Sequence, residues 1–120
     1  MANERLINLG GNGPLTNIDP TVGDGFNAIR YLSRARTSPG EEAGQSWTEP
    51  GNKLASARWY ATAQTLGDGR VFVASGSLNG LNPTVKENNN PTYEILDING
   101  VSNGQNIDLD ILVKNQPYYM

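Results

Sequence analysis

The sequence contains no cysteine and no histidine. The absence of cysteine excludes disulfides and thiolate metal sites, and it prevents any inference about redox compartment from cysteine usage. The absence of histidine removes the commonest metal ligand and the commonest general base, so tyrosine, lysine and carboxylates remain for any site chemistry. A complete transition-metal site within these 120 residues is therefore not expected.

Apolar side chains and positive charge are also scarce. Hydrophobic residues make up 37% of the chain, against 14 glycines, 7 prolines and many asparagines, so much of the chain is expected to be turn and loop. The net charge is -3 and the nine basic residues are scattered singly, which argues against nucleic acid or a membrane surface as partner. Neither a signal peptide nor a membrane-spanning run is expected from the sequence.

The stretch from Ala55 to Gly76 predicts an antiparallel hairpin, because two apolar-rich arms flank a Gly-Asp-Gly turn that supplies positive φ values. The first arm alternates as a half-buried strand does, and Val71 to Ala74 is typical of a strand buried on both faces. Strands are expected near 5–9, 26–32, 58–66, 70–75, 92–97 and 109–113, with no helix beyond a short turn.

Polar, Pro- and Gly-rich segments predict loops at 12–25, 33–45 and 77–91. The run Asn88-Asn89-Asn90 is expected to pin the last loop through hydrogen bonds from side chain to backbone. Five aspartates lack the spacing of an EF-hand loop, which leaves calcium as an open alternative rather than a prediction. They are Asp19, Asp24, Asp97, Asp108 and Asp110.

An internal repeat is visible when the strand-to-glycine units are compared. RLINLGGN from Arg5 matches RVFVASGS from Arg70 at an offset of 65, and AIRYL from Ala28 matches TYEIL from Thr92 at an offset of 64. A long period with about four strands per unit is typical of propeller blades. The sequence therefore predicts an all-β fold, a kelch-like β-propeller fragment of about two blades of four-stranded antiparallel sheet.

The repeat also predicts how the chain is divided. Residues 1–53 are expected to form a partial blade with long loops, 54–113 one near-complete blade, and 114–120 the start of the next blade, with Tyr118 and Tyr119. Blades bury their faces against neighbouring blades. The chain is therefore expected to need the missing propeller blades or to associate with itself.

Longer motifs carry a resemblance to a known family. GGNGP, DPTVGDGFNAIRYL, WTEPGNKLASARWY, ILVKNQPYYM and above all RWY…TLGDGRVFVASGSLNG…NNNPTYEI resemble the N-terminal catalytic propeller of fungal glyoxal oxidases. These are kelch-type radical copper oxidases related to galactose oxidase. The resemblance covers nearly the whole chain. It implies a secreted enzyme that oxidises a small aldehyde to a carboxylic acid and reduces oxygen to hydrogen peroxide at one copper.

The resemblance assigns one site residue. Members of the family bind copper through two Tyr and two His, and one Tyr is cross-linked to a Cys. Tyr60, in the RWY motif, takes the cross-linked position, which makes it the catalytic, cofactor-binding and copper-ligating residue implied here. The other ligands have no counterpart in this sequence, and one phenolate is too few ligands to hold copper selectively. The chain alone is therefore expected to bind no copper and to be inactive.

Several alternatives stay open. Tyr60 is alternatively a packed tyrosine on an inner strand, with its hydroxyl hydrogen-bonded. Arg58 is expected to bond loop carbonyls rather than to support the site by its charge, and Trp59 and Trp47 are expected to pack between blades rather than to form a substrate platform. As a function of another class, the chain is alternatively a non-catalytic kelch-type module whose loops bind a protein or a glycan.

Overall fold

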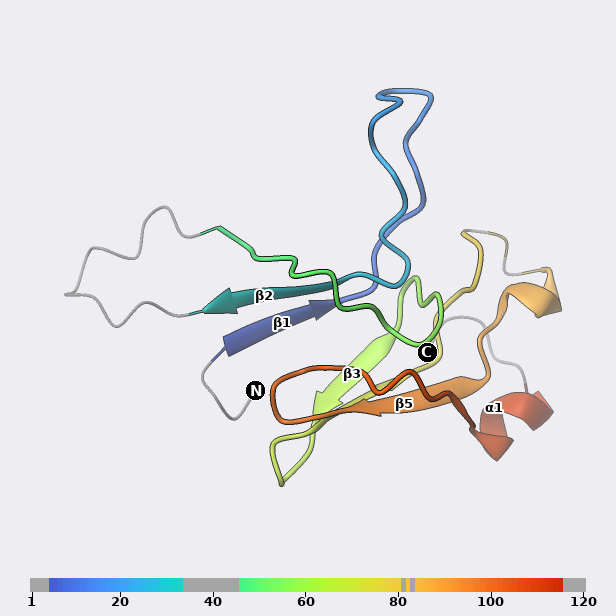
Figure 1. The fold of residues 1–120 in the computed structure, drawn as a ribbon. Coiled ribbons are helices and arrows are strands. Elements are labelled where there is room, and N and C mark those ends of the chain that lie inside the picture. The colour runs from blue at the N-terminus through green and yellow to red at the C-terminus, as the bar shows by residue number, and fades with distance from the viewer. Residues whose placement is uncertain (1–4, 34–45, 81, 83, 116–120) are drawn as a thin grey trace.

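The computed structural model describes residues 5–33, 46–80, 82 and 84–115. Within these ranges the chain forms two antiparallel sheets and a short helix, so the all-β expectation is confirmed (Figure 1). The elements are β1 (Arg5–Leu9), β2 (Ile29–Ser33), β3 (Thr62–Thr65), β4 (Val71–Ala74), the 3-10 helix η1 (Lys86–Asn88), β5 (Thr92–Leu96), β6 (Ile107–Asp108) and the helix α1 (Asp110–Asn115).

Each sheet is a meander of sequence neighbours. Strands β1 and β2 form a two-stranded sheet, and the other four follow in the order β3-β4-β5-β6. The hairpin expected around the Gly-Asp-Gly turn is confirmed, since the Leu66 amide donates to the Arg70 carbonyl at 2.8 Å and Gly69 adopts a φ of 90°. The segment between β1 and β2 projects away from both sheets (Figure 1).

The first hairpin, β1–β2, and the second hairpin, β4–β5, have the same register. Leu6 lies opposite Leu32, and Val71 lies opposite Leu96. Adding 65 to the first residue of a β1–β2 pair and 64 to the second gives a β4–β5 pair for four of the five β1–β2 pairs; the exception is the end pair, Arg5 and Ser33. The sequence repeat is therefore also a repeat of backbone geometry.

The equivalence continues past the ends of β1 and β4. The amide of Gly10 donates to the Ala28 carbonyl at 2.9 Å, and the amide of Ser75 donates to the Thr92 carbonyl at 3.0 Å. Gly10 and Ser75 occupy the same place in the repeat, and both have left-handed backbone, with φ of 70° and 63°. Serine adopts this conformation rarely, which indicates that the repeat imposes it.

The core lies between one face of each hairpin. Its buried members come from both hairpins and from the connection between them: Ile29, Tyr31, Leu54, Val71, Val73 and Leu96. Polar contacts also connect the two sheets. The Tyr31 hydroxyl, on β2, donates to the Gly100 carbonyl, in the turn after β5, at 2.6 Å. Arg5 donates to the Asn99 carbonyl at 2.7 Å and stacks over the Tyr31 ring.

The expectation of a half-buried strand over 58–66 is wrong in two respects. The strand begins only at Thr62, because Tyr60 has a left-handed φ of 59° that interrupts the extended chain. All four residues of β3 are exposed. Their exposure follows from position, since β3 lies at one edge of its sheet in the described part of the chain.

The strand expected at 109–113 is also wrong. Pairing with β5 ends at Asp108, and Asp110–Asn115 forms α1, a helix of less than two turns. Asp110 in the first turn and Lys114 in the last complement the helix dipole and approach within 3.7 Å of each other. The apolar run that suggested a strand buries only Leu112 among the helix residues, and short apolar runs do not distinguish strand from helix.

Other expectations are met in part. The strand expected at 26–32 begins at Ile29. Thr48, next to Trp47, forms a single bridge with Tyr31. The predicted asparagine anchoring is confirmed for Asn90, which donates to the Ala57 carbonyl at 3.0 Å. Most of the loop at 33–45, and Tyr118 and Tyr119, lie outside the described residues.

Gly10 provides a test of the repeat geometry. A Cβ added there would overlap the carbonyl oxygen of Arg58, and left-handed backbone costs an alanine about 1–2 kcal/mol. We expect Gly10→Ala to lower the free energy of unfolding, measured in urea, by clearly more than about 2 kcal/mol.

Two control variants separate the causes of that loss. Gly51 has a φ of 94° with no atom near an added Cβ, so Gly51→Ala reports the backbone cost alone. Gly23 has neither constraint, so Gly23→Ala should change stability by less than about 0.5 kcal/mol. Equal losses for Gly10→Ala and Gly51→Ala would contradict the close passage at Arg58.

Candidate functional site

The candidate site is built on a buried ion pair. Arg58 and Glu94 both have fully buried side chains, and Arg58 Nε donates to Glu94 Oε1 at 2.9 Å. The guanidinium also donates to the carbonyls of Ser75 and Thr92, at 3.1 and 2.9 Å, and to Asn106 Oδ1 at 3.0 Å. The expectation that Arg58 bonds loop carbonyls is therefore met in part, since Ser75 follows β4 in a connection whereas Thr92 is the first residue of β5.

The carboxylate of Glu94 is equally well satisfied. It accepts a hydrogen bond from the Ala55 amide at 3.0 Å and another from Ser102 Oγ at 2.6 Å. Burial lowers the pKa of Arg58, and the hydrogen bond and charge of Glu94 act against that shift. The ion pair and the hydrogen bonds around it thus offset the free-energy cost of removing both charges from water.

The backbone around Arg58 joins the two hairpins. Its amide donates to the Phe26 carbonyl at 2.9 Å, in the segment leading into β2. The chain then passes between Gly10 and Gly76. A Cβ added at Gly10 would overlap the Arg58 carbonyl oxygen, and one added at Gly76 would overlap the Trp59 carbonyl oxygen and crowd the Arg58 backbone. Glycine at both positions is required by this close approach.

Trp59 and Tyr60 point in different directions because of their backbone. Trp59 is buried, and it exchanges backbone hydrogen bonds with Ser77 at 2.9 and 2.7 Å. Tyr60 is left-handed and 67% exposed, with its ring edge-on to the Trp59 ring at a centroid distance of 4.5 Å. The alternative of a packed Tyr60 on an inner strand is therefore wrong. Trp59 is a buried support rather than a platform.

A cavity of about 250 Å³ lies beside Tyr60. The end of β1, the following glycines and the Arg58 segment meet around it, and its lining residues are Asn8, Leu9, Gly10, Gly11, Asn12, Arg30, Trp59, Tyr60 and Ala61. Arg30 donates to the Gly10 carbonyl at 3.2 Å and pairs with Glu49 at 3.4 Å. The cavity thus presents one phenol, one cation and amide groups.

This donor set does not fit a copper site by itself. Tyr60 is the one phenol that lines the cavity, and the sequence has no histidine or cysteine to join it. Across the ranges described, no three His, Cys, Asp or Glu side chains gather closely enough to hold a metal ion. The five aspartates considered for calcium form no such cluster there.

Sequence reasoning missed Glu94. The signal was present, because Glu94 lies two residues before the buried Leu96 on β5 and therefore shares its inward face. An acidic residue at an inward position requires a buried partner, and Arg58 is the one that the fold supplies.

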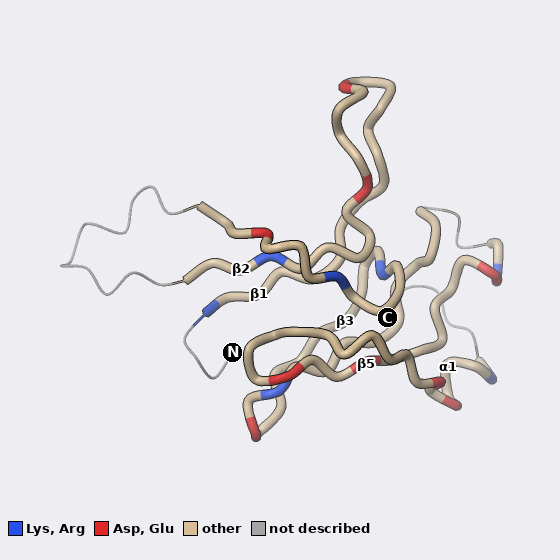
Figure 2. Tube along the Cα trace, viewed as in Figure 1, with Lys and Arg blue, Asp and Glu red and all other residues tan. Residues whose placement is uncertain are grey.

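The charges elsewhere are dispersed, and Figure 2 shows Lys and Arg separated from one another along the trace. None of the helices in the described ranges is long and apolar enough to cross a membrane.

Comparison with protein-family models, curated proteins and solved structures found no match to this chain.

Removal of one partner tests the ion pair. We expect Glu94→Gln to lower the free energy of unfolding by about 3–5 kcal/mol, because the Arg58 charge then stays buried without its counter-ion. Asp68 pairs with Arg70 at 2.7 Å on the surface, so Asp68→Asn is the matched control and should cost no more than about 1 kcal/mol. Chemical denaturation of the three proteins gives the values. An equal loss of unfolding free energy in both variants would show that the buried ion pair stabilises the fold no more than the surface pair does.

Proposed function

We propose that this chain is a fragment of a kelch-type propeller in a glyoxal-oxidase-like copper radical oxidase, with a partial blade followed by a near-complete blade and with Tyr60 as a copper-ligating tyrosine. Such an enzyme converts a small aldehyde to a carboxylic acid and reduces oxygen to hydrogen peroxide. The observation that carries the proposal is the conformation of Tyr60, which is left-handed, exposed and set directly after a buried ion pair.

The architecture supports the proposal at the level of the repeat. The four-stranded antiparallel meander β3-β4-β5-β6 is the arrangement of a propeller blade. The first hairpin repeats the second in register and lies against it. In a propeller β3 would be the strand next to the central channel, which agrees with its place at one edge of the sheet.

The surroundings of Tyr60 support its assignment. A non-glycine residue with left-handed backbone carries strain, and such residues cluster at functional sites. Arg58 and Trp59, the other two residues of the RWY motif, are both buried and fixed by hydrogen bonds. They hold the Tyr60 phenol at the rim of a cavity instead of in the core.

The proposal requires ligands from outside these 120 residues, because Tyr60 alone does not make a copper site. Histidines, a second tyrosine and the cross-linking cysteine would have to come from further sequence of the enzyme. What this chain contributes is the position and orientation of one phenol.

A chimaera tests the assignment of Tyr60. These 120 residues would replace the matching segment of a family glyoxal oxidase, and peroxide release from glyoxal would be measured together with copper content. We expect the chimaera to turn over and its Tyr60→Phe variant to lose turnover, since the ring is kept while the ligand oxygen is removed. The isolated chain should release no peroxide.

Tyr93→Phe is the control, because it also removes a phenol oxygen but lies on β5 with its ring against Phe72. It should keep turnover, and circular dichroism should show the same fold for all the chimaeras. Turnover by the Tyr60→Phe chimaera would show that the assignment is wrong. A folded chimaera that gains neither copper nor turnover would favour the non-catalytic binding module.

A further inference from the structure

The two hairpins meet through faces that are not equivalent. The first hairpin contributes Ile7, Ile29 and Tyr31 to the core, whereas the second contributes Val71, Val73 and Leu96. By the offsets of 65 and 64, the contributing residues of the first hairpin correspond to Phe72, Tyr93 and Ile95, on the opposite face of the second hairpin. The contact is therefore head-to-tail, and within the described residues each hairpin keeps one face that takes no part in it.

We call these unused faces the leading face and the trailing face. The leading face is the outer side of the first hairpin, with Leu6, Asn8, Arg30 and Leu32. The trailing face is the outer side of the second hairpin, with Phe72, Ala74, Tyr93 and Ile95, extended by Ile107 opposite Tyr93.

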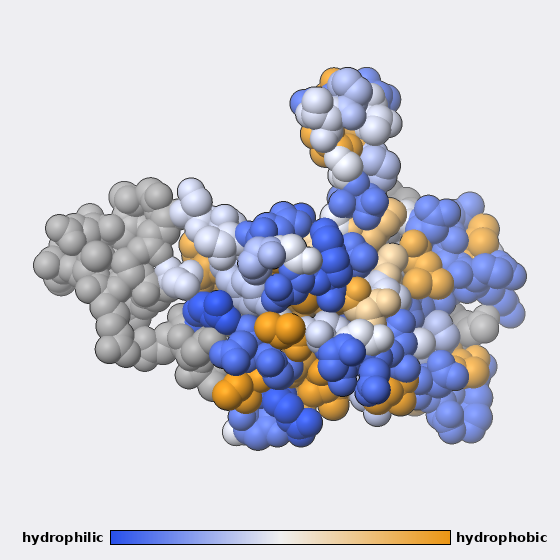
Figure 3. All heavy atoms as spheres, in the orientation of Figure 1, coloured by the Kyte–Doolittle hydropathy of each residue, from blue (hydrophilic) through white to orange (hydrophobic). Residues whose placement is uncertain are grey.

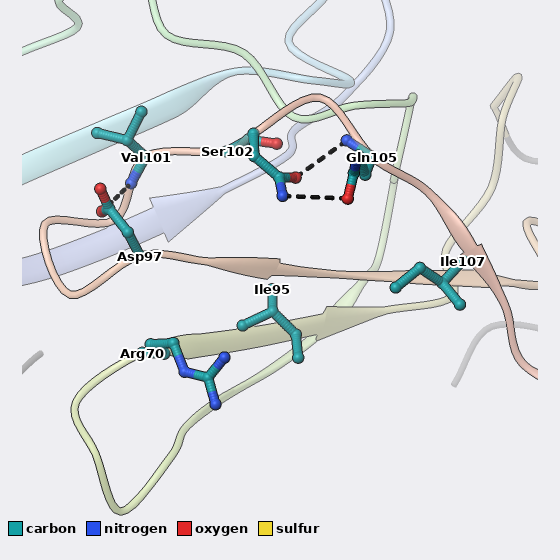
Figure 4. A pocket seen from close by; sticks show the side chains of 8 residues that line it. Arg70, Ile95, Asp97, Val101, Ser102, Gln105 and Ile107 are labelled. Atoms are coloured by element: carbon teal, nitrogen blue, oxygen red, sulfur yellow. Dashed lines mark hydrogen bonds between the residues drawn. The ribbon is translucent and has the colours of Figure 1, made fainter.

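The trailing face is apolar and open. Ile107 is 45% exposed, and a cavity of about 520 Å³ is lined by Ile95, Ile107 and the Asp97–Gln105 segment (Figure 4). Figure 3 shows hydrophobic atoms at the surface over the four-stranded sheet. Arg70 also lines this cavity, at the repeat position of Arg5. Arg5 is the residue that donates across the existing contact to Asn99.

The leading face is the counterpart that the trailing face would meet. Leu6 and Leu32 correspond to Val71 and Leu96, which are buried in the existing contact. Leu6 is 61% exposed. Asn8 takes the place of the apolar Val73, and Arg30 the place of the charged Glu94. The centre of the leading face is therefore more polar at one position, so a second contact of this kind should be weaker than the one within the chain.

We propose that a second copy of this chain docks its leading face on the trailing face of the first. The occupant is a second copy because each molecule carries both halves of a contact that the fold already uses once, so the new interface continues an existing one. This inference rests on the repeat geometry and not on the copper site. In a head-to-tail assembly, one leading face and one trailing face stay free at the two ends, so further copies can add. Such an assembly grows as an open chain, or closes to a ring when its two ends meet.

Sedimentation velocity on single-face variants tests the proposal. The wild-type chain should form species larger than dimers as concentration rises. Leu6→Asp blocks the leading face and Ile95→Asp blocks the trailing face, and each variant alone should be monomeric. Each substitution should raise the dissociation constant at least about tenfold, because the interface would bury an unpaired carboxylate. Mixed in equal amounts, the two variants should form a dimer and nothing larger, since each keeps one intact face.

Two controls distinguish a loss of docking from a loss of folding or a general effect of an added carboxylate. Ile18→Asp, at a 78% exposed position on the projecting loop, should associate as the wild type does. Circular dichroism checks that each variant folds, and Ile107→Asp replaces Ile95→Asp if the latter does not. A wild-type chain that stays monomeric would overturn the proposal. Association of either variant alone, or a mixture that stays monomeric, would do the same.

Discussion

The structure depends on the buried pair between Arg58 and Glu94. The guanidinium is held by the second hairpin, while the amide of the same residue donates to the Phe26 carbonyl, just before β2 of the first hairpin. One residue thus connects both repeat units. Because neither charge can be left alone in the core, the pair fixes where the connecting segment passes, and that passage sets the directions of Trp59 and Tyr60.

The candidate site exists only because the two units are joined in this way. The cavity beside Tyr60 is lined on one part by Gly10 and Gly11 of the first unit. Trp59 and Tyr60, which belong to the connection to the second unit, line another part. Gly10 and Gly76 allow the backbone of Arg58 to pass between the units. The proposed role of Tyr60 and the head-to-tail relation of the hairpins are therefore two consequences of one repeat.

Much of the fold could be predicted from the sequence, because its signals are local. The apolar runs of β1, β4 and β5 and the Gly-Asp-Gly turn depend on neighbours in the chain, and the offsets of 65 and 64 extend to the register itself. The helix at Asp110–Asn115 was not predictable in this way, since a short apolar run suits either element. Nor was the exposure of β3, which depends on its place at a sheet edge.

The site shows the same division. The resemblance pointed to Tyr60, but its left-handed backbone and its exposure arise from contacts between segments far apart in the chain. The spacing from Leu96 places Glu94 on the inward face of β5, but its partner Arg58 lies 36 residues away, and nothing local relates the two positions. Sequence patterns give little information about which charged residues pair across long distances in the chain.

Native-state hydrogen exchange tests most directly whether the pair makes the two hairpins one cooperative unit. The amides of Gly10 and Ser75 make equivalent hydrogen bonds in the two units, at 2.9 and 3.0 Å. If Arg58 couples the hairpins, both amides should exchange with one opening free energy, equal to that of global unfolding. Exchange at Gly10 through a separate opening of much lower free energy, with Ser75 still protected, would contradict the account.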